Sequence, residues 1–384
     1  MKALVFSRKP VRYAAAMVAG RVAPGLGATY GPLTIKDIDP PSLPGPGWER
    51  VRPRLAGICG SDLATIDGYA SRYFEPIVSF PFVPGHEVVC DLDDGTRAVL
   101  IPVLGCAARG LAPPCEWCQR GDLNRCERIA FGHIEPGLQT GFCTDTGGGW
   151  STQLVAHESQ VVPVPDDLTD EEAVLVEPTA CAVHAARRIV AGEVVLIGAG
   201  ALGLLTLAAV RHLDLIGTGP VVITAKHPEQ RQWARQLGAD HVVEPDELGR
   251  VVRSLTGSWM VDGRLSGGAD HVVDCVGTED SLTQSLSVVA PGGTVHVVGM
   301  PARVALDLTS LWHREVSLSG CYAYQRTDFD TAIELVRAAD LGRLLTATYP
   351  LARYRDALEH AAQAGSRGAV KVAFDLRQEK ERNR

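Results

Sequence analysis

The chain has 384 residues and a formal net charge of −8, with 37 Lys and Arg against 45 Asp and Glu. Apolar residues make up 46% of the sequence, which is typical of a globular protein long enough to form two domains. The negative charge argues against partners such as nucleic acid or an anionic membrane. The N-terminal apolar run is too short for a signal peptide. The longest uncharged apolar stretch, Val194–Val210, is shorter than the roughly 18 residues of a membrane span. We therefore expect a cytoplasmic protein.

The first part of the chain combines short β-type runs with clusters of Gly and Pro. Ala98–Ile101 and Gln160–Val162 are two such runs, and Pro40–Gly47 is one of the turn clusters. This pattern predicts a mostly antiparallel, barrel-like or irregular β domain. Near the C-terminus, Lys371–Phe374 is a further apolar run that we expect to pair back into the same domain.

From Thr169 onward, helical and strand patterns alternate. Asp170–Arg188 is predicted to be a helix, with Thr169 as its N-cap. The expected strands after it are 193–197, 220–225, 271–275 and 294–298, and the expected helices are 201–213, 229–237 and 280–289. Strands that alternate with helices favour an α/β fold with a parallel, doubly wound sheet.

A glycine-rich turn joins the first of these strands to its helix. The sequence Gly198-Ala199-Gly200-Ala201-Leu202-Gly203 follows the apolar run Val194–Ile197 and matches the G-x-G-x-x-G pattern. The glycines Gly198, Gly200 and Gly203 allow backbone amides to approach a pyrophosphate at the helix N-terminus, and Leu202 belongs to the same turn. The motif predicts a dinucleotide site.

The end of the next strand indicates which dinucleotide is bound. Folds that bind NAD place Asp or Glu there, to hold the ribose hydroxyls. This chain has Ala225 followed by Lys226 and His227, with Arg231 in the following helix. These cations would attract a 2′-phosphate, so we predict a preference for NADP(H). Binding of NAD(H) is the alternative if the basic residues are ordinary solvated side chains.

Four of the ten cysteines, Cys106, Cys115, Cys118 and Cys126, lie close together in the sequence. In a chain without an export signal, such clustering favours a metal site over disulfides.

Three further fragments complete a known pattern: Gly57–Asp62, Pro84–Glu87 and Val176–Pro178. Together with the cysteine cluster and the glycine turn, they make the chain resemble the zinc-dependent medium-chain alcohol dehydrogenase family. Within that family the chain is most similar to the polyol and threonine dehydrogenase branch, which has Glu at the third zinc-ligand position. The resemblance covers 47–374. It implies a GroES-like, mostly-β catalytic domain (1–178, completed by 323–384) and a Rossmann domain (179–322).

The resemblance also assigns roles to individual residues. It implies a catalytic zinc held by Cys59, His86 and Glu177, with Glu87 near the metal as an occasional alternate ligand. Ser61 matches the hydroxyl that accepts the substrate proton. Three protein ligands leave one zinc position open for the substrate oxygen, whose pKa the metal lowers. We therefore expect hydride transfer between NADP(H) and a secondary alcohol or polyol, or the matching ketone.

The proton relay and the opening segment depart from the family pattern. The relay usually continues to a histidine three residues after the serine, but that position is Ala64. Water, the cofactor ribose or another residue must then pass the proton onward.

The segment 8–31 is longer than the usual opening hairpin, and it is either a loop over the substrate cleft or an oligomer contact.

The segment that carries the four clustered cysteines, which we call the structural zinc lobe, also departs from the family pattern. The family spacing C-x2-C-x2-C-x7-C is matched by Cys115, Cys118 and Cys126, whereas its first position is Ala112. We expect Cys106 to complete a structural zinc site through a longer loop. The alternatives are an empty lobe and a lobe closed by a different ligand.

Two other functions remain open. One is an NADPH-dependent reductase of C=N or C=C bonds from the same family, which would not need the relay histidine. The other is a catalytically silent protein that binds zinc and nucleotide and acts through partners, although Cys59, Ser61, His86 and Glu177 argue against it. We expect a small-molecule substrate, and a homodimer or homotetramer.

Overall fold

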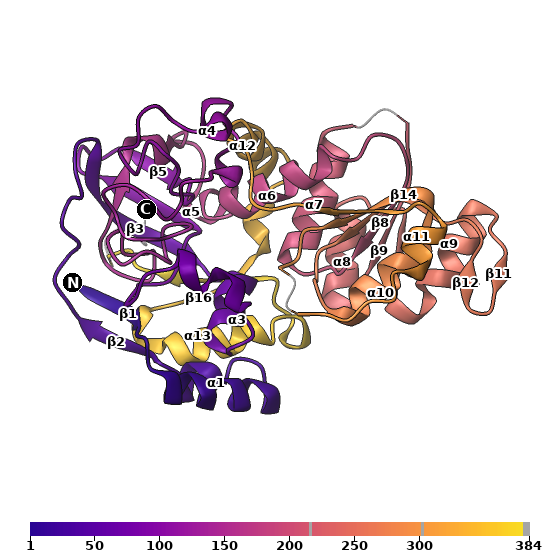
Figure 1. Cartoon of the computed structure of the whole chain (residues 1–384), viewed down its shortest axis with the longest axis horizontal. Coiled ribbons are helices and arrows are strands. Elements are labelled where there is room, and N and C mark those ends of the chain that lie inside the picture. The colour runs from indigo at the N-terminus through magenta and orange to yellow at the C-terminus, as the bar shows by residue number, and fades with distance from the viewer. Residues whose placement is uncertain (215–216, 301–302, 379–384) are drawn as a thin grey trace. The chain divides into compact units, whose positions relative to one another are not determined.

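The computed structural model describes residues 1–214, 217–300 and 303–378. The chain divides into two compact units, the first comprising Met1–Glu177 with Tyr324–Arg384 and the second comprising Pro178–Ala323 (Figure 1). The expected domain limits, 178/179 and 322/323, each differ from this division by one residue. Residues 379–384 of the expected C-terminal segment lie outside the described part of the chain.

The first unit is built around a seven-stranded sheet. Its strand order is β16-β17-β3-β4-β5-β7, and β6 also pairs with β3. The strands are β3 (Trp48–Gly57), β4 (Val88–Leu92), β5 (Arg97–Leu100), β6 (Leu154–His157), β7 (Val161–Pro163), β16 (Leu345–Tyr349) and β17 (Lys371–Asp375). Every pairing is antiparallel except that of β16 with β17. The predicted antiparallel β domain is confirmed, and so is the return of Lys371–Phe374 into it, because β17 pairs with β3.

The opening segment forms two helices between a pair of antiparallel strands. These elements are β1 (Lys2–Phe6), α1 (Pro10–Val22), α2 (Gly27–Tyr30) and β2 (Leu33–Asp37). The buried carboxylate of Asp67 accepts hydrogen bonds from the amides of Gly25 and Gly27, at 2.8 and 2.9 Å. The helix α2 packs on α1 and also on α13 (Tyr354–Ala362). The segment is therefore packed into the first unit rather than extended from it.

The remaining α-helices of the first unit are α3 (Gly60–Ile66), α4 (Glu116–Gln119), α5 (Asp170–Ala173) and α12 (Asp328–Ala338). The prediction of one helix over 170–188 is wrong, because α5 ends at Ala173 and α6 (Val176–Ala186) begins after a break. Pro178 explains the break. Its ring would clash with the carbonyl of residue 174 inside a continuous helix, whereas it is tolerated in the first turn of a new one.

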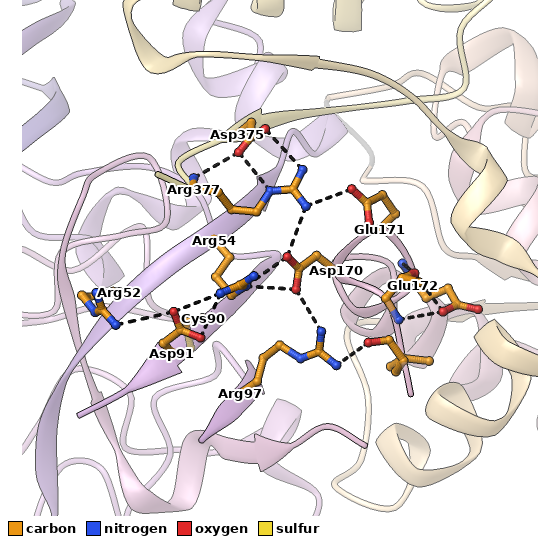
Figure 2. Close-up of polar contacts among 12 residues, drawn as sticks. Arg52, Arg54, Cys90, Asp91, Arg97, Asp170, Glu171, Glu172, Asp375 and Arg377 are labelled. Carbon is orange, nitrogen blue, oxygen red and sulfur yellow. Dashed lines mark hydrogen bonds and ion pairs between the residues drawn. The ribbon is translucent and has the colours of Figure 1, made fainter. Parts of the chain in front are cut away.

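A network of arginines and carboxylates joins several elements of the first unit (Figure 2). Asp170, at the start of α5, accepts hydrogen bonds from Arg54 on β3, Arg97 on β5 and Arg377 just after β17. Asp170 is 5% exposed, so three guanidinium groups surround one buried carboxylate.

The second unit contains the parallel sheet predicted from the sequence. Its strand order is β10-β9-β8-β13-β14-β15, and all the pairings are parallel. The strands are β8 (Gly192–Ile197), β9 (Thr218–Thr224), β10 (His241–Val243), β13 (Ala269–Asp274), β14 (Val289–Val297) and β15 (Ser317–Gly320). The helices are α7 (Ala201–His212), α8 (Pro228–Gln236), α9 (Leu248–Thr256), α10 (Glu279–Val288) and α11 (Thr309–His313). The strand order reverses next to β8, where such sheets bind nucleotides.

Several elements of the second unit were not predicted, namely β10, α9, α11, β15 and one hairpin. A short hairpin of β11 (Met260–Val261) and β12 (Arg264–Leu265) turns through Asp262 and Gly263, both of which have positive φ. Leu265 packs in the core of the unit. Among the described residues, no helix is long and apolar enough to cross a membrane.

Candidate metal and cofactor sites

Three of the predicted catalytic residues meet in the first unit. The ligand atoms of Cys59, His86 and Glu87 all lie within 4.8 Å of one another. Cys59 is the N-cap of α3, and the other two residues directly precede β4. His86 is 4% exposed and Glu87 is 1% exposed. A partly buried thiol, a buried imidazole and a buried carboxylate in this arrangement form a donor set that suits a zinc ion.

Asp62 connects two of these residues. One carboxylate oxygen accepts a hydrogen bond from the Cys59 amide at 3.1 Å, and the other lies 3.4 Å from Nδ1 of His86. Burial opposes a charge on His86, but the neighbouring Asp62 and Cys59 raise the pKa of its imidazole well above the usual value. A carboxylate behind a histidine orients the ring toward a metal and fixes its tautomer.

A lysine that the sequence analysis did not single out lies in the same cluster. Lys371 on β17 forms an ion pair with Glu87, with its Nζ 2.6 Å from Oε1. Burial works against the charge of Lys371, yet Glu87, Cys59 and Glu177 together hold its pKa above the usual value. The signal in the sequence was weak: one cation in an otherwise apolar strand run. Glu87 thus has a partner of its own beside the metal position.

Glu177 lies next to this cluster but outside the set of mutually close ligand atoms. It is 6% exposed, in the first turn of α6. Burial raises the pKa of Glu177 to about 7, against the opposing charge of His86. Tyr324, which was also not predicted, hydrogen-bonds to this carboxylate and favours its ionised form.

The predicted proton acceptor, Ser61, is partly buried in the first turn of α3. Ala64 lies one turn further along the same helix, so the relay position carries no polar side chain. The hydroxyl of the neighbouring Thr65 donates to the backbone carbonyl of Ser61 at 2.9 Å.

The four clustered cysteines also come together. All four Sγ atoms lie within 4.8 Å of one another, and Cys106 Sγ is 3.8 Å from Cys126 Sγ. Backbone amides donate to the sulfurs: Cys115 to Cys106 at 3.3 Å, and Cys106 to Cys118 at 3.5 Å. Hydrogen bonds, chiefly from Cys118, lower the pKa of Cys126 to about 5. Such a sulfur cage, with amide donors and no disulfide, fits a structural zinc ion.

In the second unit, the glycine turn has the geometry that its motif predicts. Gly198 has φ +94°, and a Cβ on Gly203 would lie 1.8 Å from the carbonyl oxygen of Gly198. Gly200 caps α7 with open space where a Cβ would stand. The amide of Gly198 donates to Thr224 Oγ1 at 2.9 Å, so β9 helps to hold the turn. Leu202 lies in the first turn of α7.

At the end of β9, the predicted cations differ in their surroundings. Ala225 is buried, Lys226 is exposed, and His227 is the partly exposed N-cap of α8. Arg231 forms an ion pair with Glu244 at 2.8 Å and donates to the carbonyl of Lys226 at 3.2 Å. Lys226 is therefore the cation best placed to contact a ligand at this position.

Comparisons with known proteins cover both units. Residues 45–166 match the model of the alcohol dehydrogenase GroES-like domain, and residues 201–338 match that of the zinc-binding dehydrogenase. L-idonate 5-dehydrogenase of Vitis vinifera is 29% identical, over 88% of this chain and 90% of its own length. Sorbitol dehydrogenase of Bacillus subtilis is 27% identical, over 82% and 86%.

A solved structure shares the fold of the chain. A protein from Sinorhizobium meliloti 1021, crystallised with NADP, is 23% identical and has a TM-score of 0.70, over 89% of this chain and 96% of its own. The two family matches, the dehydrogenase relatives and the two ligand clusters lead to one conclusion. The chain belongs to the zinc-dependent medium-chain alcohol dehydrogenase family, on its polyol-dehydrogenase-like branch, and is an alcohol oxidoreductase.

Proposed function

We propose that the protein interconverts a secondary alcohol or polyol and the matching ketone, with NADP(H) as the preferred cofactor. The observation that carries the proposal is the convergence of the partly buried Cys59 and the buried His86 beside two buried carboxylates, Glu87 and Glu177. The relatives named for idonate and sorbitol support a hydroxylated substrate.

In this proposal, Cys59, His86 and Glu177 hold the catalytic zinc. When bound, zinc acts as a Lewis acid on the substrate oxygen, and the nicotinamide accepts or returns the hydride. Asp62 holds His86 and the Cys59 backbone in position. Lys371 neutralises Glu87, which leaves Glu177 as the carboxylate that completes the ligand set.

The chain itself must also move the substrate proton. Ser61, at the start of α3, is the proposed first acceptor. Because Ala64 cannot take the proton further, water or the cofactor ribose would carry it from the serine. A reductase of C=N or C=C bonds is the second candidate, and Ala64 is the residue that favours it.

Turnover separates these two candidate functions. Purified protein is mixed with NADPH and a panel of ketones, imines and enones, and separately with NADP and the matching alcohols, while the nicotinamide absorbance is followed. We expect reduction of ketones and oxidation of secondary alcohols. His86→Ala should abolish turnover while cofactor binding is retained, and a near-native rate in that variant would refute the zinc-based reaction. Reduction of imines or enones alone would favour the second candidate.

Cofactor preference is tested at the end of β9. Charge-assisted hydrogen bonds to a phosphate contribute roughly 1.5–3 kcal/mol each, and tenfold in kcat/KM needs only ~1.4 kcal/mol. We expect NADP(H) to exceed NAD(H) by at least about tenfold, Lys226→Ala to reduce the preference, and Ala225→Asp to reverse it. Equal efficiency with NAD(H) in the unmutated enzyme would contradict the proposal.

A further inference from the structure

Arg109 is a fully buried arginine in the lobe that carries the four cysteines. Its exposed fraction is 0%, and burial lowers the pKa of its guanidinium group. Among the described residues, no ion pair joins Arg109 to a carboxylate; its hydrogen bonds instead go to five backbone carbonyls. The acceptors are Leu104 (3.1 Å), Phe131 (3.0 Å), Ile134 (3.3 Å), Glu135 (3.4 Å) and Gly137 (2.6 Å).

These acceptors lie on two separate stretches of the lobe. Leu104 precedes Cys106, and the other four follow Cys126, so the side chain ties together the two ends of the cysteine-bearing segment. The backbone makes the same connection: the amide of His133 donates to the carbonyl of Arg109 at 3.3 Å. A Cβ on Gly132 would lie 2.4 Å from that carbonyl oxygen, which shows how closely the two stretches approach.

Arg109 also lies within the loop that departs from the family spacing. Cys106 and Cys115 flank it, and the backbone amide of Arg109 bonds to the carbonyl of Cys106 at 3.2 Å. A longer loop between two ligands has more conformations to lose when the metal binds. The fork-shaped guanidinium group restricts this loop independently of the metal.

The charge of the metal site gives a second reason to connect Arg109 with the four cysteines. A zinc ion bound by four thiolates carries a net charge of −2, and a buried negative group needs a compensating charge nearby. The buried guanidinium group has no carboxylate partner among the described residues and is a cation that the lobe offers.

We propose that Arg109 is a positioning residue for the four-cysteine metal site: it pre-forms the Cys106–Cys115 loop and balances the charge of the metal–thiolate centre. This inference rests on the proposed structural zinc site. Zinc should therefore bind less tightly when Arg109 is replaced, even where the fold is kept.

The test measures zinc affinity by chelator competition in the His86→Ala background, where the four cysteines are the remaining proposed zinc site. Arg109→Met should lose about a hundredfold in affinity, and Arg109→Lys, which keeps the charge but cannot reach both stretches, about tenfold. The matched control is Arg120→Met. Arg120 is an exposed arginine of the same lobe that pairs with Glu116, four residues earlier, and its loss should leave the affinity unchanged.

Unchanged affinity in Arg109→Lys and Arg109→Met would overturn the inference. The thermal midpoint of the Arg109 variants, measured with and without zinc, separates an effect on zinc binding from a purely structural effect. An equal decrease of the midpoint with and without zinc would also overturn the inference. If Arg109→Met does not fold, Arg109→Lys decides the outcome. A parent protein that takes up no zinc at the cysteines would refute the structural site itself, whereas the alcohol assay tests the catalytic proposal independently.

Discussion

At the scale of single residues, the ion pair between Lys371 and Glu87 is the least expected feature of the catalytic cluster. The two side chains are 4% and 1% exposed, and they lie 284 positions apart in the chain. Removing one partner of a buried pair leaves an uncompensated charge, whereas removing both is often tolerated. The pair therefore offers a sharp test of whether Lys371 serves to neutralise Glu87.

We expect Lys371→Met to lower the free energy of unfolding by about 3–5 kcal/mol, because Glu87 is then buried alone. The double variant Lys371→Met/Glu87→Gln should recover most of that loss. Urea unfolding of the four proteins in the cycle gives the coupling energy. If the losses of the two single variants simply add in the double variant, Lys371 and Glu87 do not depend on each other.

At the scale of elements, Asp170 connects β3, β5, α5 and the residues after β17 through Arg54, Arg97 and Arg377 (Figure 2). Asp170→Asn should lower the free energy of unfolding by about 3 kcal/mol, because three partly buried guanidinium groups lose their shared anion. The matched control is Asp167→Asn. Asp167 pairs with Arg337 at the surface, with side chains 69% and 47% exposed.

The exposed pair should contribute no more than about 1 kcal/mol, so the control variant should unfold close to the parent protein. Chemical denaturation of both variants checks this contrast. Similar small losses at the two positions would mean that the network around Asp170 contributes little to stability.

Two histidines on neighbouring strands of the second unit predict that this unit is sensitive to acid. His271 on β13 and His296 on β14 are hydrogen-bonded at 3.1 Å, between Nδ1 and Nε2. Burial, together with the charges of His271 and Arg188, lowers the pKa of His296 to about 4, and burial also lowers that of His271. The folded unit therefore keeps His296 neutral at a pH where the unfolded chain takes up a proton.

A depressed histidine pKa contributes stability above pH 6.5, the ordinary value, and this stability is lost as the pH falls toward 4. Protonation of His296 should lower the free energy of unfolding by about 3 kcal/mol over that interval. Thermal unfolding at pH 7, 6, 5 and 4 measures it. His296→Gln should flatten the decline, whereas the exposed His313→Gln should not. An equally steep decline in His296→Gln would assign the acid sensitivity to other groups.

At the scale of the whole molecule, the two ligand clusters predict two zinc ions per chain. Elemental analysis of the purified protein should give two, and Cys106→Ser should reduce the value to one. Chelation of the structural ion should lower the thermal midpoint more than it alters the chemistry, because the binding free energy of a structural metal is part of the folding free energy. One zinc per chain, unchanged by Cys106→Ser, would show that the four cysteines do not hold a metal.

The sequence by itself determined the features that depend on local chemistry. The glycine turn at Gly198 and Gly203 is readable because its steric requirement lies within a few residues. The alternation of apolar strands and helices in the second unit predicted a parallel sheet, because periodicity reflects which side chains are buried. The residue types of Cys59 and His86, within their short motifs, were enough to indicate a metal site.

Tertiary structure alone decided the features that depend on which distant elements become neighbours. The register of β17 against β3 brings Lys371 to Glu87, and the strand order places three arginines around Asp170. The pairing of Arg231 with Glu244 likewise depends on β10 lying beside β9. Buried charges need partners, but a sequence shows only that the charges exist. Their pairing follows from strand order and register, which are set by the packing of the whole sheet.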